Sequence, residues 1–377
     1  MEHLPIPISI ILGTRPEAIK LAPVIQQFKA APLFNTQVIL TGQHREMVDQ
    51  VMQLFNLVAD RDLAIMQPQQ TLTNITCWSL EGLEQLFQEL APRLVIVQGD
   101  TTTAFAAALA AFYQKIPVGH VEAGLRTDSI YNPYPEEANR RLISQITTLH
   151  FAPTNLAMEH LQNSGVLGTI HQTGNTVIDA LLAVASQNPP CEIPGLEWGR
   201  YRTLLATVHR RENWGTPLEN IATGLLQILE AFPDTALLLP LHRNPTVREP
   251  LKARLGNHPR VFLTEPLDYT TLVGAIQRCY LLLTDSGGLQ EEAPALGKPV
   301  LVLRETTERP EAITAGTARL IGTQPQRLLA EAGELLSNLA TYEQMATAVN
   351  PFGDGHAAER ILQIVKNFFK ENSQGWG

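Results

Sequence analysis

Three acidic side chains in the first half of this 377-residue chain have the type and placement that acid–base chemistry needs. Asp100 and Glu122 each follow a short apolar run that predicts a strand, and Glu136 opens a predicted helix. In open parallel sheets, ligands bind beyond the carboxyl ends of the strands. Carboxylates that converge at such an edge can move a proton to and from carbon.

Two of these acids also have structural alternatives. Asp100 stands where an aspartate commonly caps the following helix. Glu136 and Arg140 have the i,i+4 spacing of a surface ion pair. Glu122 has a weaker structural explanation, and the presence of three acids in one domain favours the catalytic interpretation.

The second half of the chain carries cations and small residues at similar places. His209, Arg210 and Arg211 follow a predicted strand, and His242 and Arg243 follow the next one. A later strand runs into Ser286, Gly287 and Gly288, which lead onto a helix. Backbone N–H groups can approach phosphate oxygens closely at such a turn, so the sequence predicts a diphosphate site.

Further candidates lie at the starts of other helices. Arg15 and Lys20 stand near the amino end of the first predicted helix, as a second anion site or as two solvated cations on a capped helix. Glu291 and Glu292 either complement a helix N-terminus or accept hydrogen bonds from ribose hydroxyls. Arg309 is a further candidate cation.

Composition excludes several classes of protein. The net charge of −9 argues against a broad nucleic-acid surface or a surface for anionic membranes. The chain has no G-x-G-x-x-G fingerprint, which counts against a bound dinucleotide. Three separated cysteines indicate neither a disulfide framework nor a zinc site. The amino terminus shows no secretory signal and no apolar run reaches the ~20 residues of a membrane span, so we expect a cytoplasmic protein.

The elements that must position these residues are short strands alternating with helices, the pattern of parallel α/β sheets. We expect domains at residues 1–185 and 186–354, divided by the Pro-rich linker or hinge Ser186–Trp198, and an amphipathic helix within 355–377 that packs back on the first domain. The predicted strands are Ile8–Leu12, Val38–Thr41, Leu94–Gln98, Val118–Val121, Leu149–Ala152, Ile170–Thr173, Thr203–Thr207, Ala236–Leu241, Val261–Thr264, Leu281–Thr284, Val300–Leu303 and Arg319–Ile321.

The motifs occur in a characteristic order along both halves: G-T-R-P-E-A-I-K, T-G-Q-H, V-Q-G-D-T, V-E-A-G-L-R-T, P-E-E-x-N-R, T-G-N-T-V-I-D, H-R-R-E-N, T-D-S-G-G-x-Q-E-E and E-R-P-E. From about residue 5 to residue 370, the chain resembles the non-hydrolysing UDP-N-acetylglucosamine 2-epimerases. The resemblance implies an α/β fold with two Rossmann-like domains facing a cleft, of the GT-B type. It also implies interconversion of UDP-GlcNAc and UDP-ManNAc.

Residue roles follow from this resemblance motif by motif. It makes Asp100, Glu122, Glu136 and His209 the catalytic candidates. The implied substrate-binding residues are Arg15, Lys20, Leu267, Leu272, Ser286, Gly287, Gly288, Glu292 and Arg309, with Glu292 on the ribose and the backbone of Glu265–Tyr269 and the region of Leu272 at the uracil. The implied allosteric contacts to a second UDP-GlcNAc are Gln43, His44, Arg210 and His242. Glu46 and Gln69 depart from the pattern of strongly regulated members.

The implied mechanism explains the residue types. The C2 proton of an N-acetyl sugar is not acidic enough for direct removal, so UDP leaves by anti elimination and 2-acetamidoglucal forms. Re-addition after protonation from the other face inverts C2. Neither NAD nor a metal is needed, and the family resemblance favours a homodimer.

Three other functions remain open. A retaining GT-B glycosyltransferase would share the fold and the diphosphate turn. A hydrolysing epimerase would release free ManNAc. A sugar-nucleotide sensor would have no use for the three acids together. Neither the polysaccharide pathway served nor the face of the sugar served by each acid follows from the sequence.

Overall fold

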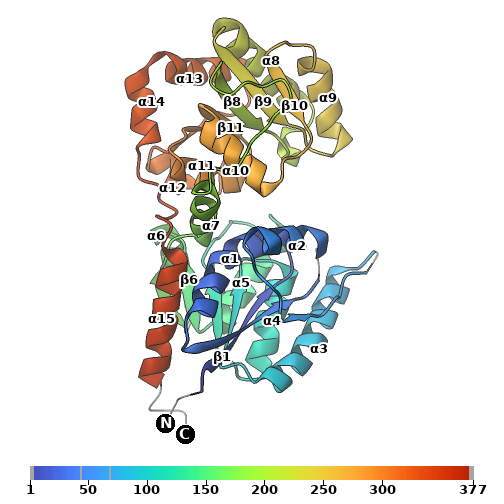
Figure 1. The fold of residues 1–377 in the computed structure, drawn as a ribbon, viewed down its shortest axis with the longest axis vertical. Coiled ribbons are helices and arrows are strands. Elements are labelled where there is room, and N and C mark those ends of the chain that lie inside the picture. The colour runs from blue at the N-terminus through green and yellow to red at the C-terminus, as the bar shows by residue number, and fades with distance from the viewer. Residues whose placement is uncertain (1–3, 43–44, 68, 373–377) are drawn as a thin grey trace. The chain divides into compact units, whose positions relative to one another are not determined.

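The computed structural model describes residues 4–42, 45–67 and 69–372. These residues form two compact units, which are described separately below. Unit 1 contains the residues up to Ala180 together with those from Phe352 onward, and unit 2 is Leu181–Pro351. The boundary at Ala180 lies within a helix, whereas the sequence suggested residue 185. Figure 1 shows both units as ribbons, with many of their helices and strands labelled.

Unit 1 is built on a parallel sheet with the strand order β3-β2-β1-β4-β5-β6-β7. The order reverses between β1 and β4, which makes their carboxyl ends a switch point where ligands bind in such folds. The strands are β1 Ile6–Leu12, β2 Phe34–Leu40, β3 Arg61–Asp62, β4 Leu94–Gln98, β5 Val118–Val121, β6 Leu149–Ala152 and β7 Thr169–Gln172.

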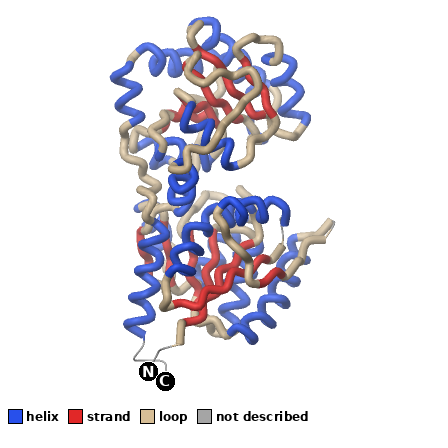
Figure 2. The backbone as a smooth tube through the Cα atoms, in the orientation of Figure 1, coloured by secondary structure: helices blue, strands red, loops and turns tan. Residues whose placement is uncertain are grey.

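Helices cover both faces of this sheet, as Figure 2 shows for the blue segments around the red strands. The residues of β4 are buried throughout, the pattern of a strand enclosed on both faces. The Ala-rich α4 packs closely against α3 and the sheet. The helices are α1 Arg15–Ala30, α2 Arg45–Leu54, α3 Leu72–Leu90, α4 Thr102–Tyr113, α5 Glu136–Ile146, α6 Asn155–Asn163, α7 Thr176–Ala185 and α15 Ala357–Asn372.

The C-terminal helix α15 belongs to unit 1. It lies against α1, and the rings of Phe34 and Phe369 are 6.0 Å apart. Its first turn is capped by Asp179 of α7, whose carboxylate accepts hydrogen bonds from the backbone N–H groups of Ala357 at 3.2 Å and Ala358 at 2.8 Å. Helix α15 is therefore held to unit 1 at both ends.

Unit 2 repeats the architecture with the strand order β10-β9-β8-β11-β12-β13, again all parallel. The predicted α/β class with two parallel sheets is confirmed. The elements are β8 Arg202–Thr207, η1 Arg211–Asn213, α8 Thr216–Ala231, β9 Thr235–Pro240, α9 Pro245–Leu255, β10 Val261–Thr264, α10 Tyr269–Arg278, β11 Leu281–Thr284, α11 Gly287–Ala295, β12 Val300–Val302, α12 Pro310–Thr314, β13 Ala318–Leu320, α13 Pro325–Ser337 and α14 Leu339–Ala346.

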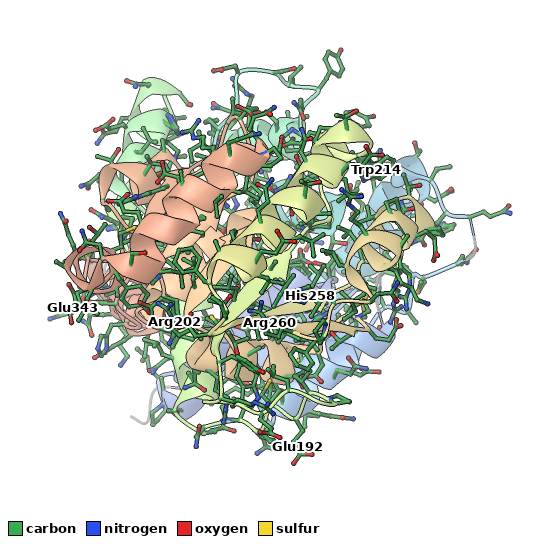
Figure 3. All side chains as sticks on the ribbon, turned by 90° about the horizontal axis from the view of Figure 1, so that it is seen from above. Glu192, Arg202, Trp214, His258, Arg260 and Glu343 are labelled. Carbon is green, nitrogen blue, oxygen red and sulfur yellow. The ribbon has the colours of Figure 1, made fainter. Side chains whose placement is uncertain are left out.

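Two arginines labelled in Figure 3 stabilise the amino-terminal edge of this second sheet. Arg202 pairs with Asp234 at 2.7 Å. Arg260 donates to the carbonyl oxygens of Phe232 at 3.1 Å and Thr235 at 2.6 Å, closing the end of α8. These cations are structural and lie at the edge opposite the one where ligands bind.

The segment 186–198 belongs to unit 2 and contacts the remainder of that unit. Arg278 donates to the side-chain oxygen of Asn188 at 3.2 Å, and a Cβ atom on Gly274 would lie 3.0 Å from the Cβ atom of Cys191. Ile193 is 6% exposed. In the part of the chain that the structure describes, no helix is long and apolar enough to span a membrane.

Candidate functional site

Glu122 lies at the carboxyl end of β5 in unit 1 and is the most tightly held of the predicted acids. Lys20 places its ammonium nitrogen 2.6 Å from both carboxylate oxygens. Gln98 and Asn175 also donate to the carboxylate, Asn175 at 2.9 Å. The backbone of Glu122 is left-handed, with φ of 64°. Such a conformation costs a non-glycine residue about 1–3 kcal/mol and is typical of functional sites.

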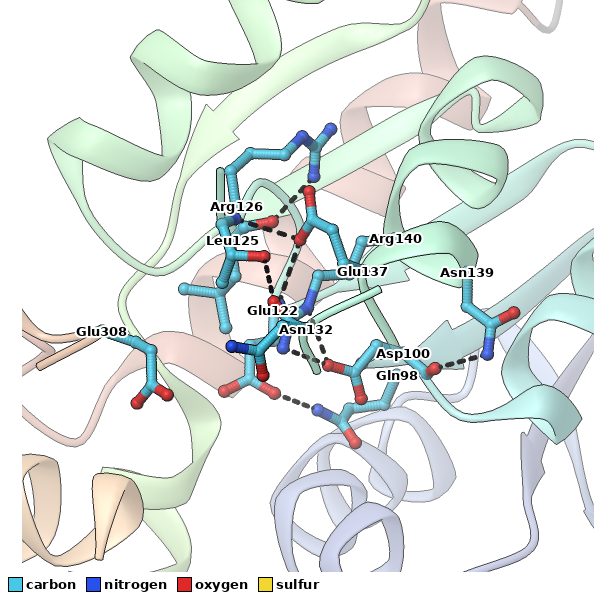
Figure 4. A network of polar contacts seen from close by, with 12 residues as sticks. Gln98, Asp100, Glu122, Leu125, Arg126, Asn132, Glu137, Asn139, Arg140 and Glu308 are labelled. Carbon is cyan, nitrogen blue, oxygen red and sulfur yellow. Dashed lines mark hydrogen bonds and ion pairs between the residues drawn. The ribbon is translucent and has the colours of Figure 1, made fainter. Parts of the chain in front are cut away.

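Asp100 follows β4, the strand next to β5, and its carboxylate is ion-paired. The Nε and Nη2 atoms of Arg140 lie 2.8 Å and 2.7 Å from Oδ2 of Asp100 (Figure 4). The capping alternative for Asp100 is wrong, because the side chain of Thr101 accepts the hydrogen bond from Ala104 N at 3.0 Å. Asp100 is therefore available for another role beside its arginine.

Glu136 and Glu137 are neighbours in different environments. Glu136 is half-buried at the start of α5, and among the described residues its carboxylate has no hydrogen bond or ion pair. The expected pair with Arg140 does not form, because Arg140 contacts Asp100 and Glu137 instead. Glu137 is fully buried and also pairs with Arg141 at 2.7 Å. Glu137 was not predicted from the sequence.

The side chain of Glu17, a residue of α1, occupies the amino end of that helix. Glu17 accepts hydrogen bonds from the backbone N–H of Gly13 at 2.9 Å and of Thr14 at 2.6 Å, and from the hydroxyl of Thr101 at 2.6 Å. Burial raises the pKa of Glu17, and these hydrogen bonds oppose that shift. Lys20 pairs with Glu122 and is therefore not a solvated cation, and Arg15 is half-buried at the start of the helix.

In unit 2, His209 is oriented by a buried aspartate. Its Nδ1 lies 2.8 Å from Oδ1 of Asp285, which is fully buried and follows β11. Asp285 also accepts from the backbone N–H of Arg210 and the amide of Asn213. Burial alone would raise the pKa of Asp285, but the hydrogen bonds and charge of His209 and these N–H groups hold it below its usual range. The contact of Nδ1 with Asp285 leaves Nε2 of His209 for a ligand.

An apolar pocket of about 160 Å³ adjoins this histidine within unit 2. The rings of His209 and His242 stack with centroids 6.2 Å apart. Leu267 and Leu272, which the resemblance places at the uracil, both line the pocket. Its other lining residues are Thr207, Val208, Pro240, Leu241 and Pro266. Apolar walls with a few polar groups are typical of sites for small ligands.

The small-residue turn opens α11 as the sequence predicts. Ser286 is the N-cap residue, and Gly287 and Gly288 are the first residues of the helix. A Cβ atom on Gly287 would lie 3.5 Å from Nη2 of Arg210. Arg210 and the first N–H groups of α11 thus lie on the same small region of surface. This arrangement suits a phosphate group.

The two carboxylates that follow this turn, Glu291 and Glu292, also have defined partners. Glu292 is 7% exposed and accepts a 3.2 Å hydrogen bond from the hydroxyl of Tyr269. Glu291 forms an ion pair with Arg309, so the interpretation of Glu291 as a simple helix-terminus charge is incomplete. Arg309 reaches this carboxylate from the start of α12.

An ion network that the sequence did not predict lies beside these residues. Arg304 is 5% exposed in its side chain and contacts Glu212 at 2.5 Å and Glu308 at 2.8 Å. Burial would raise the pKa of Glu308, but Arg304, Arg210 and Arg309 together lower it to about 2. Glu308 therefore stays ionised and offsets part of the positive charge in this region.

The structure groups the predicted residues into two sets, one in each unit. Unit 1 brings Lys20 to Glu122, and unit 2 brings His209, Arg210 and Ser286–Gly288 together. Gln43 and His44 lie outside the described residues, so the allosteric contacts stay a prediction. Among the described residues, no three His, Cys, Asp or Glu side chains are grouped as metal ligands would be.

Comparison with known proteins assigns the chain to a family. A family model described as UDP-N-acetylglucosamine 2-epimerase matches residues 26–366. UDP-N-acetylglucosamine 2-epimerase of Escherichia coli strain K12 is 49% identical over 367 residues, which cover 95% of this chain and 97% of the relative. The Salmonella typhimurium enzyme of the same name is 50% identical over 368 residues, with coverage of 95% and 98%.

Solved structures agree in fold. The UDP-GlcNAc 2-epimerase of Neisseria meningitidis bound to UDP-GlcNAc has a TM-score of 0.87 at 44% identity, covering 96% of this chain and all of its own. The enzyme of Methanocaldococcus jannaschii in complex with UDP-GlcNAc and UDP has a TM-score of 0.78 at 33% identity, with coverage of 96% and 100%. Both of these structures contain bound UDP-GlcNAc.

Proposed function

Because the chain belongs to the UDP-N-acetylglucosamine 2-epimerase family, we propose that it interconverts UDP-GlcNAc and UDP-ManNAc without hydrolysing them. The observation that carries this proposal is the placement of Asp100 and Glu122 at the carboxyl ends of neighbouring strands. Proton transfer at carbon uses positioned carboxylates. A glycosyltransferase or a sugar-nucleotide sensor has no comparable use for them.

Unit 2 holds the UDP portion in this proposal. The uracil occupies the apolar pocket beside His209, and the ribose hydroxyls donate to Glu292. The diphosphate lies at the start of α11, where the N–H groups after Ser286 and the guanidinium groups of Arg210 and Arg309 supply positive charge. With Nδ1–H held by Asp285, the imidazolium form of His209 can donate its second ring N–H to the diphosphate.

The reaction begins with elimination. A carboxylate takes the proton from C2, and the electron pair of the C2–H bond forms a C1–C2 double bond. The C1–O bond breaks, and its electron pair leaves on the phosphate oxygen of UDP. The cations and N–H groups at the start of α11 stabilise this developing charge, which is the largest contribution of many enzyme sites. The products are UDP and 2-acetamidoglucal.

Re-addition reverses these steps from the other face of the sugar. A carboxylic acid protonates C2, and a phosphate oxygen of UDP attacks C1 to restore the C1–O bond. We propose Asp100, Glu122 and Glu136 as the acids and bases, since they come from the same edge of unit 1. No water takes part in the balanced reaction, so no free sugar forms.

The test is proton NMR of the purified protein with UDP-GlcNAc in D2O. We expect UDP-ManNAc to accumulate to a stable mixture with deuterium at C2 of both sugars. UDP with free ManNAc would show a hydrolysing enzyme instead, and unchanged UDP-GlcNAc would contradict the proposal. The Glu122→Gln variant serves as the control, because it should retain UDP binding in unit 2 and lose the exchange at C2.

A further inference from the structure

The two segments through which the chain passes between the units lie against each other within unit 1. The chain leaves unit 1 after Ala180 and returns at Phe352. A Cβ atom on Gly174 would lie 3.3 Å from the Cα atom of Gly353, and the backbone N–H of Asn175 donates to the carbonyl of Phe352 at 2.6 Å. We call this contact of residues 173–179 with residues 352–358 the crossing.

Several further contacts make the crossing a built structure. Asp179 caps the first turn of α15 through Ala357 and Ala358. Arg360 donates to the carbonyl of Thr173 at 3.0 Å. Gly174 has a φ of 87°, a conformation that L side chains rarely adopt, and a Cβ atom there would press on the backbone of Gly353. The direction of both connecting segments is therefore set here.

The side chain of Asn175 extends from the crossing to the candidate acid. Asn175 is 1% exposed. Its amide nitrogen donates to Oε1 of Glu122 at 2.9 Å, and its amide oxygen accepts a hydrogen bond from Val177 N at 3.2 Å in the first turn of α7. One buried side chain thus contacts both the start of α7 and a carboxylate that lies 53 positions earlier in the sequence.

We propose that Asn175 is a positioning residue that fixes the orientation of the Glu122 carboxylate and links it to the crossing. The proposal rests on the function proposed above. Lys20 contacts both oxygens of Glu122, Gln98 donates to Oε2, and Asn175 donates to Oε1. Lys20 comes from α1 and Gln98 from β4, whereas Asn175 comes from the segment that continues into unit 2.

Two directed amide donors hold a carboxylate plane more strictly than a flexible ammonium group can. Catalysis depends on such positions within about 0.5 Å, because a misplaced group loses its alignment with the reacting bond. A change in direction of either connecting segment moves the backbone of Asn175, and its amide moves with it. The orientation of Glu122 therefore follows the conformation of the crossing.

The test uses two variants that keep the hydrogen-bond acceptor for Val177. Asn175→Ser loses the donor, and its side chain is too short to reach Glu122. Asn175→Asp replaces the donor with a second carboxylate beside Glu122, whose described neighbours include the ammonium group of Lys20 and the imidazole of His120. Asn163→Asp, at an exposed position at the end of α6, is the matched control. All are compared as full-length protein by kcat, UDP affinity and pH profile.

We expect Asn175→Ser to lower kcat about 10- to 100-fold, the range known for hydrogen-bond partners that orient metal-binding side chains in other proteins. The affinity for UDP should stay within about twofold, because UDP binds unit 2. Asn175→Asp should in addition move a limb of the pH profile upward by about one pH unit, since a second carboxylate disfavours ionisation of Glu122. Asn163→Asp should behave like the unmodified protein.

Three results would overturn the proposal. One is a wild-type kcat and pH profile in both Asn175 variants while Glu122→Gln is impaired. The second is an equal fall in kcat and UDP affinity with an unshifted profile, which indicates general structural damage. The third is failure of both variants to fold, as judged by circular dichroism, which would make Asn175 a stability residue. Absence of epimerisation by the unmodified protein would instead contradict the proposed function.

Discussion

The Nδ1 atom of His209 lies 2.8 Å from Oδ1 of Asp285, a carboxylate with no exposure to solvent. Asp285 is surrounded by N–H donors, so its carboxylate oxygens act only as acceptors. A ring nitrogen held in this way fixes the tautomer of the histidine. An aspartate orients the histidine in the same way in the catalytic triads of serine proteases.

Asp285→Asn should impair both folding and function. The new amide group faces N–H donors, so at least one buried donor loses its acceptor, at a cost of about 1–3 kcal/mol. The tautomer of His209 is also no longer fixed, and we expect turnover of UDP-GlcNAc to fall at least about 100-fold. Chemical denaturation and the NMR assay measure the two effects. Asp234→Asn, which breaks an exposed pair with Arg202, should change the stability by less than about 1 kcal/mol.

The neighbouring acids Glu136 and Glu137 should give opposite phenotypes when each is changed to glutamine. Glu137 is fully buried and pairs with the largely buried Arg140 and the half-exposed Arg141. Glu137→Gln should therefore lower the free energy of unfolding by about 3–5 kcal/mol, the cost of disrupting a buried pair. Glu136→Gln should leave the unfolding midpoint unchanged and strongly reduce C2 deuterium exchange. A stable, active Glu136→Gln protein would remove Glu136 from the proposed acids.

Gly287→Ala should separate UDP binding from stability. The added methyl group would contact Arg210 at an ordinary 3.5 Å, so the unliganded fold accommodates it. The same methyl group occupies space that a phosphate at the start of α11 requires, and we expect UDP affinity to fall at least about tenfold. Gly333→Ala, within α13 and 3.4 Å from the ring of Phe232, is the control that should bind UDP normally. Isothermal titration with UDP measures both.

The stability of unit 1 should depend on pH through two buried histidines. Burial lowers the pKa of His120 to about 4 and of His150 to about 3, below the usual value of 6.5. The unfolded chain therefore binds more protons than the folded one below pH 6.5. The contribution of each histidine to the free energy of unfolding should have its full value above pH 6.5 and be lost as the pH is lowered toward 4. The loss amounts to about 1.4 kcal/mol for each unit by which the pKa is lowered. Denaturation midpoints between pH 4 and 8 test this.

His150→Leu should weaken this pH dependence and raise the stability. Both ring nitrogens of His150 lack hydrogen-bond partners among the described residues, whereas Nε2 of His120 donates to the carbonyl of Gly99 at 2.7 Å. Replacing a buried unpaired polar group by an apolar one removes its desolvation cost. His356→Leu, at an exposed position, is the control. An unchanged pH dependence in His150→Leu would assign the effect to other groups.

Each predicted strand overlaps an observed one, because central parallel strands are apolar runs that a sequence displays directly. Two neighbouring strands of the first sheet, β2 and β3, are less visible in the sequence. β2 begins at Phe34 and not at Val38, since exposed Asn35 alternates with buried Phe34 and interrupts the apolar run. β3 consists of the exposed Arg61 and Asp62 and has no apolar signal at all.

The acidic residues of the candidate site could be predicted from the sequence, but the residues that contact them could not. Asp100 and Glu122 were identified by their position after strands. Lys20 and Glu122 are 102 positions apart, and their contact depends on strand order, which composition does not encode. The Pro-rich segment was expected to be a linker, yet its Cys191 is buried against unit 2, because apolar residues between the prolines can still pack.

Unit 2 is inserted into unit 1, and this has a consequence for synthesis on the ribosome. Helix α15, which covers α1 and Phe34, leaves the exit tunnel only after all of unit 2 has been made. The unit begun first is thus completed last, and the apolar surface of α1 stays uncovered while the intervening residues are translated. A nascent chain in this interval presents the kind of surface that chaperones recognise, whereas unit 2, a continuous segment, can fold as it emerges.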